Sequence, residues 1–514
     1  SIHAALAPGI NSVLLAGLKT AVIPIVVHLV GHTGFIRIET VGHFPEQRVL
    51  QVGGVGQGCL TCLVFGFQMG QYCRIFSLII SQPVVFIVAC VSVRGDKVFL
   101  FMGHRYGLNP DRINNVGFKF SGHGAICVTM YCKCYSSIAE IPASTWDELF
   151  CSENPFVQHA YLLALEESGC VHADTGWHPQ HMLLLDGEQP VAALPLYAKS
   201  HSYGEFVFDW GWAEAYERYG LAYYPKLVTA IPYTPVAGPR IGVAADVGPA
   251  EIYPALLSAI QKLSGTHGYS GWHLLFPDTS LRTGLGSMLD ANAFLQREAV
   301  QFHWFNRDYN TFEDFLVSLR SSRRKNVRRE RRLVAEQGIS LQRKRGGEVS
   351  DEEWQGFYHC YRDTYRKRSG HDGYLNQAFF KQLRETMAES LMLVVARKGE
   401  AIVATSLFLH DRRSLYGRYW GALEDVSCLH FEACLYQGIE FCIERGIERF
   451  DPGTQGEHKL MRGFEPVRSA SYHWIADVRF RAAIEDFLQH EKRGTEKYQQ
   501  QAETFLPFKK EGSE

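Results

Sequence analysis

The feature that most constrains the fold is an order of predicted elements that occurs twice after residue 135. Hydrophobic periodicity predicts helix, helix, hairpin, strand, helix and strand in each copy. The first hairpin turns at Asp186–Gly187 and the second at Lys398–Gly399–Glu400. In the second copy, Ser350 and Glu353 form a capping box that begins a helix. The predicted fold class is therefore α/β, with mixed sheets in two tandem units that span 136–305 and 306–490.

The individual elements are predicted from apolar spacing and from turn residues. The first copy has helices over 138–150, 161–167 and 251–264, and strands over 181–185, 190–197 and 272–276. The second has helices over 350–366, 379–388 and 429–445, and strands over 391–396, 401–410, 414–422 and 448–451. Residues 491–514 are predicted to be a polar C-terminal tail.

Residues 1–135 differ from the rest of the chain and stay unassigned. They carry a net charge of +6, against −2 for the whole chain, and seven of the thirteen cysteines. Their apolar stretch Ile75–Val93 favours strands over a membrane span, because it is rich in β-branched residues and is interrupted by polar ones. Cys59 and Cys62 have no properly spaced second pair, which favours buried thiols over zinc. Both a native domain and an over-extended start fit this composition.

Cysteine usage indicates where the protein works. The total of thirteen is odd and the spacing is irregular, so a disulfide framework is not expected. This predicts a reducing compartment, and hence a cytoplasmic location. A net charge of −2 excludes a chain that is basic throughout, but it does not exclude a local basic patch.

Several long motifs stand out after residue 135: KSHSYGEFVFDWGWAEAYERYGLAYYPKL, QFHWFNRDY, SSRRKNVRRERR, LYGRYWG and LHFEACLYQGIEFCIERGIERFDPGTQGEHKLMRGFEP. They resemble the FemAB-like family of N-acyltransferases, which are described as peptidoglycan biosynthesis or recognition proteins with tandem GNAT-type folds. The resemblance covers about residues 136–490. It implies transfer of an acyl or aminoacyl group to an amine of a peptidoglycan precursor, with acyl-CoA or aminoacyl-tRNA as co-substrate and no tightly bound cofactor. The sequence itself indicates no metal site.

Acyl transfer to an amine needs a base for the amine proton and donors for the developing oxyanion. The Gly-rich segment Gly453–Phe464 follows a predicted strand, where α/β proteins tend to place ligands. Its lysine and Gly-Phe resemble an element near the active site of Fem-type aminoacyltransferases. The alternative is a solvated turn. The candidate bases are Glu457 and His458, the oxyanion or phosphate partners are Lys459 and Arg462, and Gly456 shapes the loop.

A second cluster follows the strand over 414–422. Tyr416, Arg418 and Trp420 are expected to share one face, either as an aromatic wall around substrate or as core. His430 and Glu432 begin the next helix and are further substrate-binding candidates, although Glu432 also suits the helix dipole. The loop before them lacks glycine and carries two acids, which argues against a pyrophosphate grip. An aminoacyl-tRNA donor is the competing inference.

Acidic and aromatic residues also gather in the first unit, next to a predicted strand over 205–208. Glu205 and Asp209 are predicted to hold an amine acceptor or, equally, to form a bridge to a basic segment further along the chain. Tyr203 and Trp210 belong to the same motif.

That basic segment is Arg320–Arg332, in which eight of thirteen residues are Arg or Lys. It is predicted to continue a helix over 312–334. Such runs are usually solvated surface, but this concentration favours a phosphate-bearing partner: tRNA, a nucleotide-linked precursor or anionic lipid. Its proposed contacts are Arg323, Arg324, Lys325, Arg328 and Arg329.

These features together predict an N-acyltransferase whose site lies between the two units. The alternatives are an acetyl-CoA-dependent N-acetyltransferase of small amines and a non-catalytic module that binds a precursor or RNA. The sequence fixes neither the donor nor the oligomeric state.

Overall fold

A computed structural model describes the backbone of eight strands within residues 1–129. Side chains are described for residues 130–286, 294–454 and 456–509. The chain divides into two compact units, Ser1–Ile113 and Asn114–Glu514. The predicted break at 135 is therefore too late. Strand β9 (Met130–Tyr135) belongs to the second unit, where it pairs along its whole length with β11 (His181–Asp186).

The first unit contains two antiparallel sheets. One is formed by β1 (Ile25–Val30), β2 (Phe35–Thr40) and β3 (Val49–Gln51), and the other by β4 (Cys62–Gly66), β5 (Arg74–Gln82), β6 (Val85–Arg94) and β7 (Lys97–Arg105). The apolar stretch over 75–93 is thus the β5–β6 hairpin, which confirms the prediction of strands. The Cys59–Cys62 pair lies outside the residues whose side chains are described.

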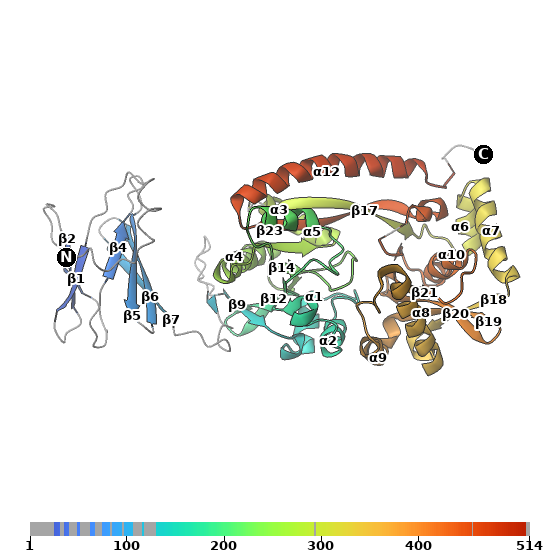
Figure 1. The fold of residues 1–514 in the computed structure, drawn as a ribbon, viewed down its shortest axis with the longest axis horizontal. Coiled ribbons are helices and arrows are strands. Elements are labelled where there is room, and N and C mark those ends of the chain that lie inside the picture. The colour runs from blue at the N-terminus through green and yellow to red at the C-terminus, as the bar shows by residue number, and fades with distance from the viewer. Residues whose placement is uncertain are drawn as a thin grey trace. The chain divides into compact units, whose positions relative to one another are not determined.

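The first copy of the repeat lies in the second unit and ends in a β–α–β crossover (Figure 1). Helix α4 connects the parallel strands β14 and β16. The elements of the first copy, besides β9 and β11, are α1 (Ala143–Phe150), α2 (His159–Glu167), β10 (Trp177–Pro179), β12 (Gln189–Leu194), β13 (Tyr197–Lys199), α3 (Trp210–Arg218), β14 (Lys226–Thr229), β15 (Gly242–Val243), α4 (Pro249–His267), β16 (Gly271–Leu275) and α5 (Thr279–Ala291).

The second copy repeats this arrangement, with β21 and β22 as the parallel pair. Its elements are β17 (Leu295–Phe305), α6 (Phe312–Ser318), α7 (Ser321–Glu336), β18 (Ile339–Arg345), α8 (Asp351–Ser369), α9 (Gln377–Thr386), β19 (Leu391–Lys398), β20 (Ala401–His410), β21 (Ser414–Ala422), α10 (Leu429–Phe431), α11 (Gln437–Arg445), β22 (Arg449–Asp451), β23 (Glu465–Ile475) and α12 (Val478–Thr504). The mixed α/β fold and the repeated order are confirmed, including the capping box at Ser350.

Several predicted elements differ from the structure. Of the helix expected over 138–150, only Ala143–Phe150 is α-helical, after a 3₁₀ turn at Ile138–Glu140. The helix expected over 312–334 is two helices, because Leu319 and Arg320 are extended and Leu319 is buried in a bridge to Phe508. The expected polar tail forms the C-terminal part of α12 as far as Thr504. Residues 205–208 form turns rather than a strand. In the part of the chain that is described, none of the helices is both long and apolar enough to cross a membrane.

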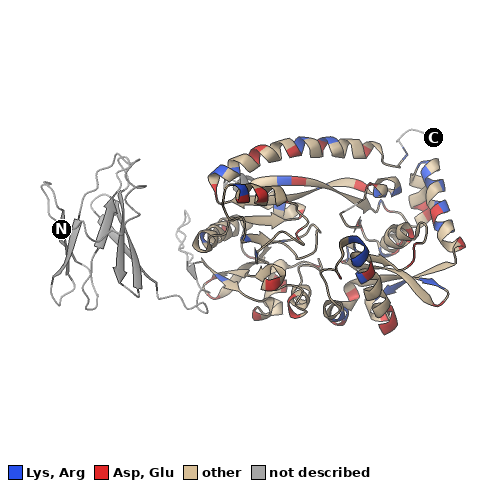
Figure 2. Cartoon of the chain, in the orientation of Figure 1, with Lys and Arg blue, Asp and Glu red and all other residues tan. Residues whose placement is uncertain are grey.

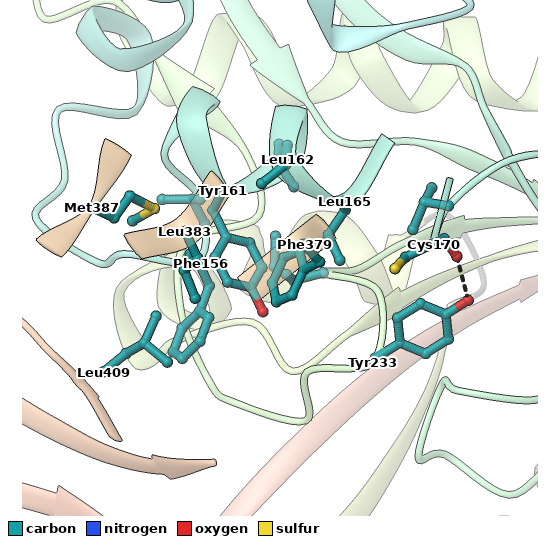
Figure 3. Packing of buried hydrophobic residues seen from close by; sticks show 14 of the residues in the cluster. Phe156, Tyr161, Leu162, Leu165, Cys170, Tyr233, Phe379, Leu383, Met387 and Leu409 are labelled. Atoms are coloured by element: carbon teal, nitrogen blue, oxygen red, sulfur yellow. Dashed lines mark hydrogen bonds between the residues drawn. The ribbon is translucent and has the colours of Figure 1, made fainter. Parts of the chain in front are cut away.

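Strand β23 joins the two halves of the second unit. It pairs with β16 on one side and with β17 on the other, within one eleven-stranded sheet that runs from β10 to β18. A shared core reinforces this junction, because Phe156 and Tyr161 of the first half pack against Phe379 and Leu409 of the second (Figure 3). The two halves thus form one packed body, and helix α12 lies along β17 and β23 (Figure 1).

Candidate functional site

The centre of the large sheet presents polar side chains where a core is normally apolar. They occupy alternate positions on neighbouring strands, so the two-residue period of the strands directs them to one face. This polar face, as we call it, is almost completely buried. Buried polar groups are usually hydrogen-bonded, so such a concentration indicates a site. Its members are His273 of β16, Gln301 and His303 of β17, Asp451 of β22, and Ser469, Ser471 and His473 of β23.

A cavity of about 630 Å³ lies against this face, between the sheet and α12. Both halves contribute to it, and we call it the junction cavity. Gln301, Ser469 and Ser471 are its polar contributions from the buried face. Apolar wall residues come from the loop Phe206–Phe208 and from Phe276, while Thr454 comes from the Gly-rich loop. This volume suits a small ligand or the reacting end of a larger one.

The Gly-rich loop places Lys459 beside the polar face. The chain leaves β22 at Asp451, and Gly453 and Gly456 adopt positive φ of 92° and 110°, which glycine tolerates. Lys459 is only 4% exposed, and its Nζ donates to the carbonyl of Gly453 at 2.6 Å. Asp451 accepts from the backbone N–H of Gly453 at 2.9 Å. The turn at Gly453 therefore anchors Lys459. The residue after this glycine, Thr454, lines the cavity.

Burial shifts the pKa values of two groups next to Asp451. Burial lowers the pKa of Lys459 to about 8, although the Asp451 carboxylate opposes that shift. Burial likewise lowers the pKa of His303 to about 4, again opposed by Asp451. The Nε2 atom of His303 lies 3.6 Å from Oδ2 of Asp451. At neutral pH the site next to Asp451 therefore holds a neutral imidazole and a lysine that is still mostly protonated.

Two other predicted residues of the loop, Glu457 and Arg462, have hydrogen-bonding partners, whereas the buried Nε2 of His458 has none among the described residues. Glu457 is exposed and accepts from the hydroxyl of Tyr498 at 2.9 Å. Arg462 forms an ion pair with Glu330 of α7 at 2.6 Å, and its guanidinium lies over the ring of Phe431. His458 packs 5.6 Å from His430, measured between ring centroids. These contacts hold α7 and the helix after β21 against the loop.

The strand β21 does not present its three predicted residues on one face. A bulge opposite Leu407 and Phe408 inserts one extra residue, so alternation is lost at Arg418. Tyr416 packs against Phe156, and Arg418 donates to the carbonyl of Tyr233 at 2.8 Å, both across the junction of the halves. Trp420 instead packs 5.5 Å from His430. The expectation of one shared aromatic wall is therefore wrong.

Glu432 takes part in an ion pair within the second half. Its carboxylate accepts two hydrogen bonds from Arg331 of α7, each at 3.0 Å, and a third from Gln437. The residue is 4% exposed. Its geometry is that of a structural partner of the basic helix.

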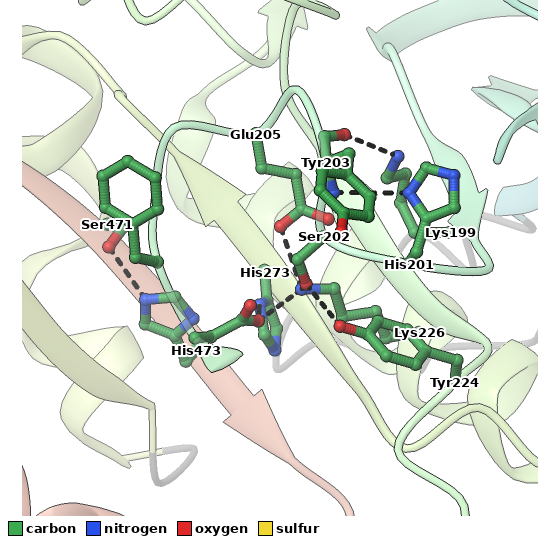
Figure 4. A network of polar contacts seen from close by, with 12 residues as sticks. Lys199, His201, Ser202, Tyr203, Glu205, Tyr224, Lys226, His273, Ser471 and His473 are labelled. Carbon is green, nitrogen blue, oxygen red and sulfur yellow. Dashed lines mark hydrogen bonds and ion pairs between the residues drawn. The ribbon is translucent and has the colours of Figure 1, made fainter. Parts of the chain in front are cut away.

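The acidic residues of the first half enclose a lysine (Figure 4). Nζ of Lys226 contacts the carboxylates of Glu205 and Asp209, and all three residues are buried. Burial alone would lower the pKa of Lys226, but the two carboxylates raise it. The expected alternatives, an amine acceptor or a bridge to the basic segment, are replaced by this internal cation.

Glu205, Asp209 and His273 also bring ligand atoms within 4.8 Å of one another, as a metal site requires. The ammonium of Lys226 lies between the carboxylates, however, and already supplies their positive charge. Tyr203 and Trp210 pack together with ring centroids 4.9 Å apart, and Trp210 lines a separate pocket of about 280 Å³. They lie outside the junction cavity.

The basic segment forms α7 on the surface of the second half (Figure 2). Arg328 pairs with Glu313, Arg331 with Glu432 and Glu440, and Arg332 with Glu336. Arg323 approaches the sulfur of Met461 in the Gly-rich loop at 3.2 Å. Helix α7 is thus partly neutralised by acids, and it borders the loop that carries Lys459. Arg324, Lys325 and Arg329 lie on its surface as well.

Sequence reasoning proposed Lys459 as a site residue but did not identify most of the polar face. The available signal was polar alternation inside apolar strands, visible as Gln301 and His303 in QFHWF and as Ser469, Ser471 and His473 in SASYHW. What the sequence could not indicate is that β23 pairs with β16 and β17, which brings these two segments together.

Comparison with known proteins identifies a family. The model of the FemAB-like family, described as peptidoglycan biosynthesis and recognition, matches residues 137–510. No curated protein matches the chain. Among solved structures, the chain is similar to FemX at 12% identity and a TM-score of 0.43, over 67% of this chain and 98% of that one. It is also similar to a tandem GNAT protein of the clavulanic acid pathway (10%, 0.38; 68% and 99%) and to a GCN5-related N-acetyltransferase from Sphaerobacter thermophilus (10%, 0.31; 67% and 95%).

Proposed function

The chain belongs to the FemAB-like family, and on that premise we propose that it transfers an acyl or aminoacyl group to an amine of a peptidoglycan precursor. The observation that carries the proposal is the junction cavity, in which the buried polar face meets the loop that holds Lys459. Neither half forms this arrangement alone. We assign the reaction to the cytoplasm, where aminoacyl donors are made.

His303 is the proposed proton acceptor. Its imidazole is neutral at physiological pH, because burial lowers its pKa to about 4. When the acceptor amine attacks the acyl carbonyl, a new C–N bond forms and the amine proton moves to the imidazole. The carboxylate of Asp451, 3.6 Å away, then stabilises the imidazolium. The tetrahedral intermediate then collapses, the acyl C–O bond to tRNA (or the C–S bond to CoA) breaks, and the imidazolium gives its proton to the departing oxygen or sulfur.

Lys459 is the proposed oxyanion partner. Burial places its pKa near 8, so most of it is a cation at pH 7. A buried cation stabilises the negative charge of a tetrahedral intermediate more strongly than a solvated one does. Without substrate, Nζ of Lys459 donates to the carbonyl of Gly453, and the same N–H groups can turn to the oxyanion when it forms. Both groups interact with Asp451, and we assign them to one reacting centre on that ground.

Two features favour an aminoacyl-tRNA donor over acyl-CoA. The loop before α10 carries Glu424, which pairs with Lys398 at 3.1 Å, and a second acid, Asp425. Acids at this position oppose a pyrophosphate. Helix α7 instead offers exposed cations next to the Gly-rich loop. These cations are the proposed contacts for the donor's phosphates.

The direct test is transfer of a labelled group to a peptidoglycan precursor with a free amine. The purified chain is incubated with that acceptor and either aminoacyl-tRNA or acetyl-CoA. We expect transfer from the aminoacyl donor, and loss of at least about a hundredfold in rate for His303→Ala and Lys459→Met. The control variants, His178→Ala and Lys381→Met, change exposed residues on other elements, β10 and α9, and should retain activity. Precursor binding without turnover of either donor would instead establish a non-catalytic binding module.

A further inference from the structure

An arginine–carboxylate pair spans the junction cavity from strand to helix. Arg297 of β17 donates to both oxygens of Glu491 of α12, through Nε at 2.8 Å and Nη2 at 2.7 Å. Its Nη1 donates to the carbonyl of Phe208 at 2.7 Å. Both charged side chains line the cavity. A guanidinium in this two-bond geometry is a recognition site for any carboxylate.

The Glu491 side chain is more exposed than that of Arg297 and is therefore held less firmly. The side chain of Glu491 is 28% exposed, and a pair of this exposure contributes little to stability. Helix α12 buries Ile484 and Leu488 on one side of Glu491, and Ala502 near its end. None of its residues from 489 to 501 is buried. Glu491 can therefore leave Arg297 without disturbing the anchored parts of the helix.

A second group in the same cavity lacks a partner. The amide nitrogen of Gln301 donates to the carbonyl of Pro235 at 3.2 Å, which fixes the orientation of the amide. Its Oε1 is buried without a hydrogen-bond donor, and the residue is 3% exposed. An unsatisfied buried acceptor favours a ligand that brings an N–H group.

We propose that the junction cavity binds an amine that also carries a carboxylate. The ligand carboxylate replaces Glu491 on Arg297, and the ligand N–H donates to Gln301 Oε1. The identification of this amine as the acyl acceptor rests on the proposed function. The two residues lie four positions apart on one strand, so their Cα atoms are separated by about 13 Å. This spacing suits an ω-amino acid better than an α-amino acid, whose two groups share one carbon.

Calorimetric titration of the full chain tests the inference without requiring turnover. The probes are Nα-acetyl-lysine, which has a carboxylate and a distant amine, and its C-terminal amide. We expect the carboxylate probe to bind about ten- to a hundredfold more tightly, as a charge-assisted pair does. Arg297→Gln should remove this preference. Glu491→Gln should strengthen carboxylate binding about two- to fivefold, because it removes the internal competitor.

Arg307→Gln is the matched control, since it breaks the ion pair between Arg307 and Glu465 outside the cavity and should leave both affinities unchanged. Equal affinity for the two probes would overturn the inference. Weaker binding in Glu491→Gln would overturn it too, because the pair would then be structural. A carboxylate preference without any transfer activity would leave this inference standing and reject the proposed function. Transfer without the preference would do the reverse.

Discussion

Gly494 offers a way to test the junction cavity as the substrate site without touching a polar group. It lies within α12 and lines the cavity, and a Cβ placed there meets no atom within 4 Å. Gly→Ala in a helix interior stabilises by about 1 kcal/mol. In a domain of this size the melting temperature should rise by about 1–2 °C, because that shift shrinks as unfolding entropy grows. Gly494→Ala should therefore be slightly more stable and fully active.

Gly494→Trp separates stability from binding. Tryptophan is also a better helix former than glycine, so the fold should be retained. Its indole occupies cavity volume, and overpacking of about 1–3 kcal/mol corresponds to a loss of about five- to a hundredfold in acceptor affinity. The assay is steady-state transfer together with thermal unfolding.

Gly265→Trp is the control, since Gly265 is an exposed, uncrowded glycine within α4. Equal KM values for the two tryptophan variants would refute the assignment of the cavity as substrate site.

Four further predictions concern other parts of the structure. Turnover should fall as pH rises through about 8, because Lys459 then loses the proton with which it stabilises the oxyanion, and Lys459→Arg should shift that fall in a pH–rate profile to higher pH. Lys226→Met should destabilise the fold by about 3–5 kcal/mol in urea unfolding, because it leaves two buried carboxylates without their cation. A chain beginning at Asn114 should unfold cooperatively, whereas one beginning at Ser136 should aggregate, because it lacks the interior strand β9. Glutamine at four positions of α7 should flatten the salt dependence of polyanion binding in titrations at increasing salt, with little change in thermal stability. These positions are Arg323, Arg324, Lys325 and Arg329.

The fold was largely accessible from the sequence because its signals are local. The hairpin β19–β20 follows from two apolar runs around Gly399, and α8 from its capping box and apolar stripe. The errors arose where tertiary contacts override local pattern. Continuous helical spacing predicts one helix over 312–334, but burial of Leu319 against Phe508 interrupts it.

The site was less accessible, because its residues come from separate strands. The sequence pattern indicated the Gly-rich loop, since a strand followed by glycines is a local signal. It could not distinguish Lys459, which is buried near a carboxylate, from Arg462, which has an ion-pair partner on α7. The bulge in β21 cannot be seen in the sequence. Tyr416, Arg418 and Trp420 alternate along the chain, but the inserted residue puts them on different faces of the strand.

The position of β23 between β16 and β17 explains why the polar groups gather at the junction. Strand β23 lies between β16 and β17, and it pairs with β16 over Ser471–Ile475 and with β17 over Glu465–His473. Separating the halves would break the β16–β23 ladder and the core that the two halves share, which makes the junction a stiff scaffold. A stiff sheet can hold unsatisfied polar atoms, such as Gln301 Oε1, that a softer core would rearrange to pair. The sheet side of the cavity is therefore preorganised, and adjustment to a ligand must come from the opposite wall, where the middle of α12 buries no side chain.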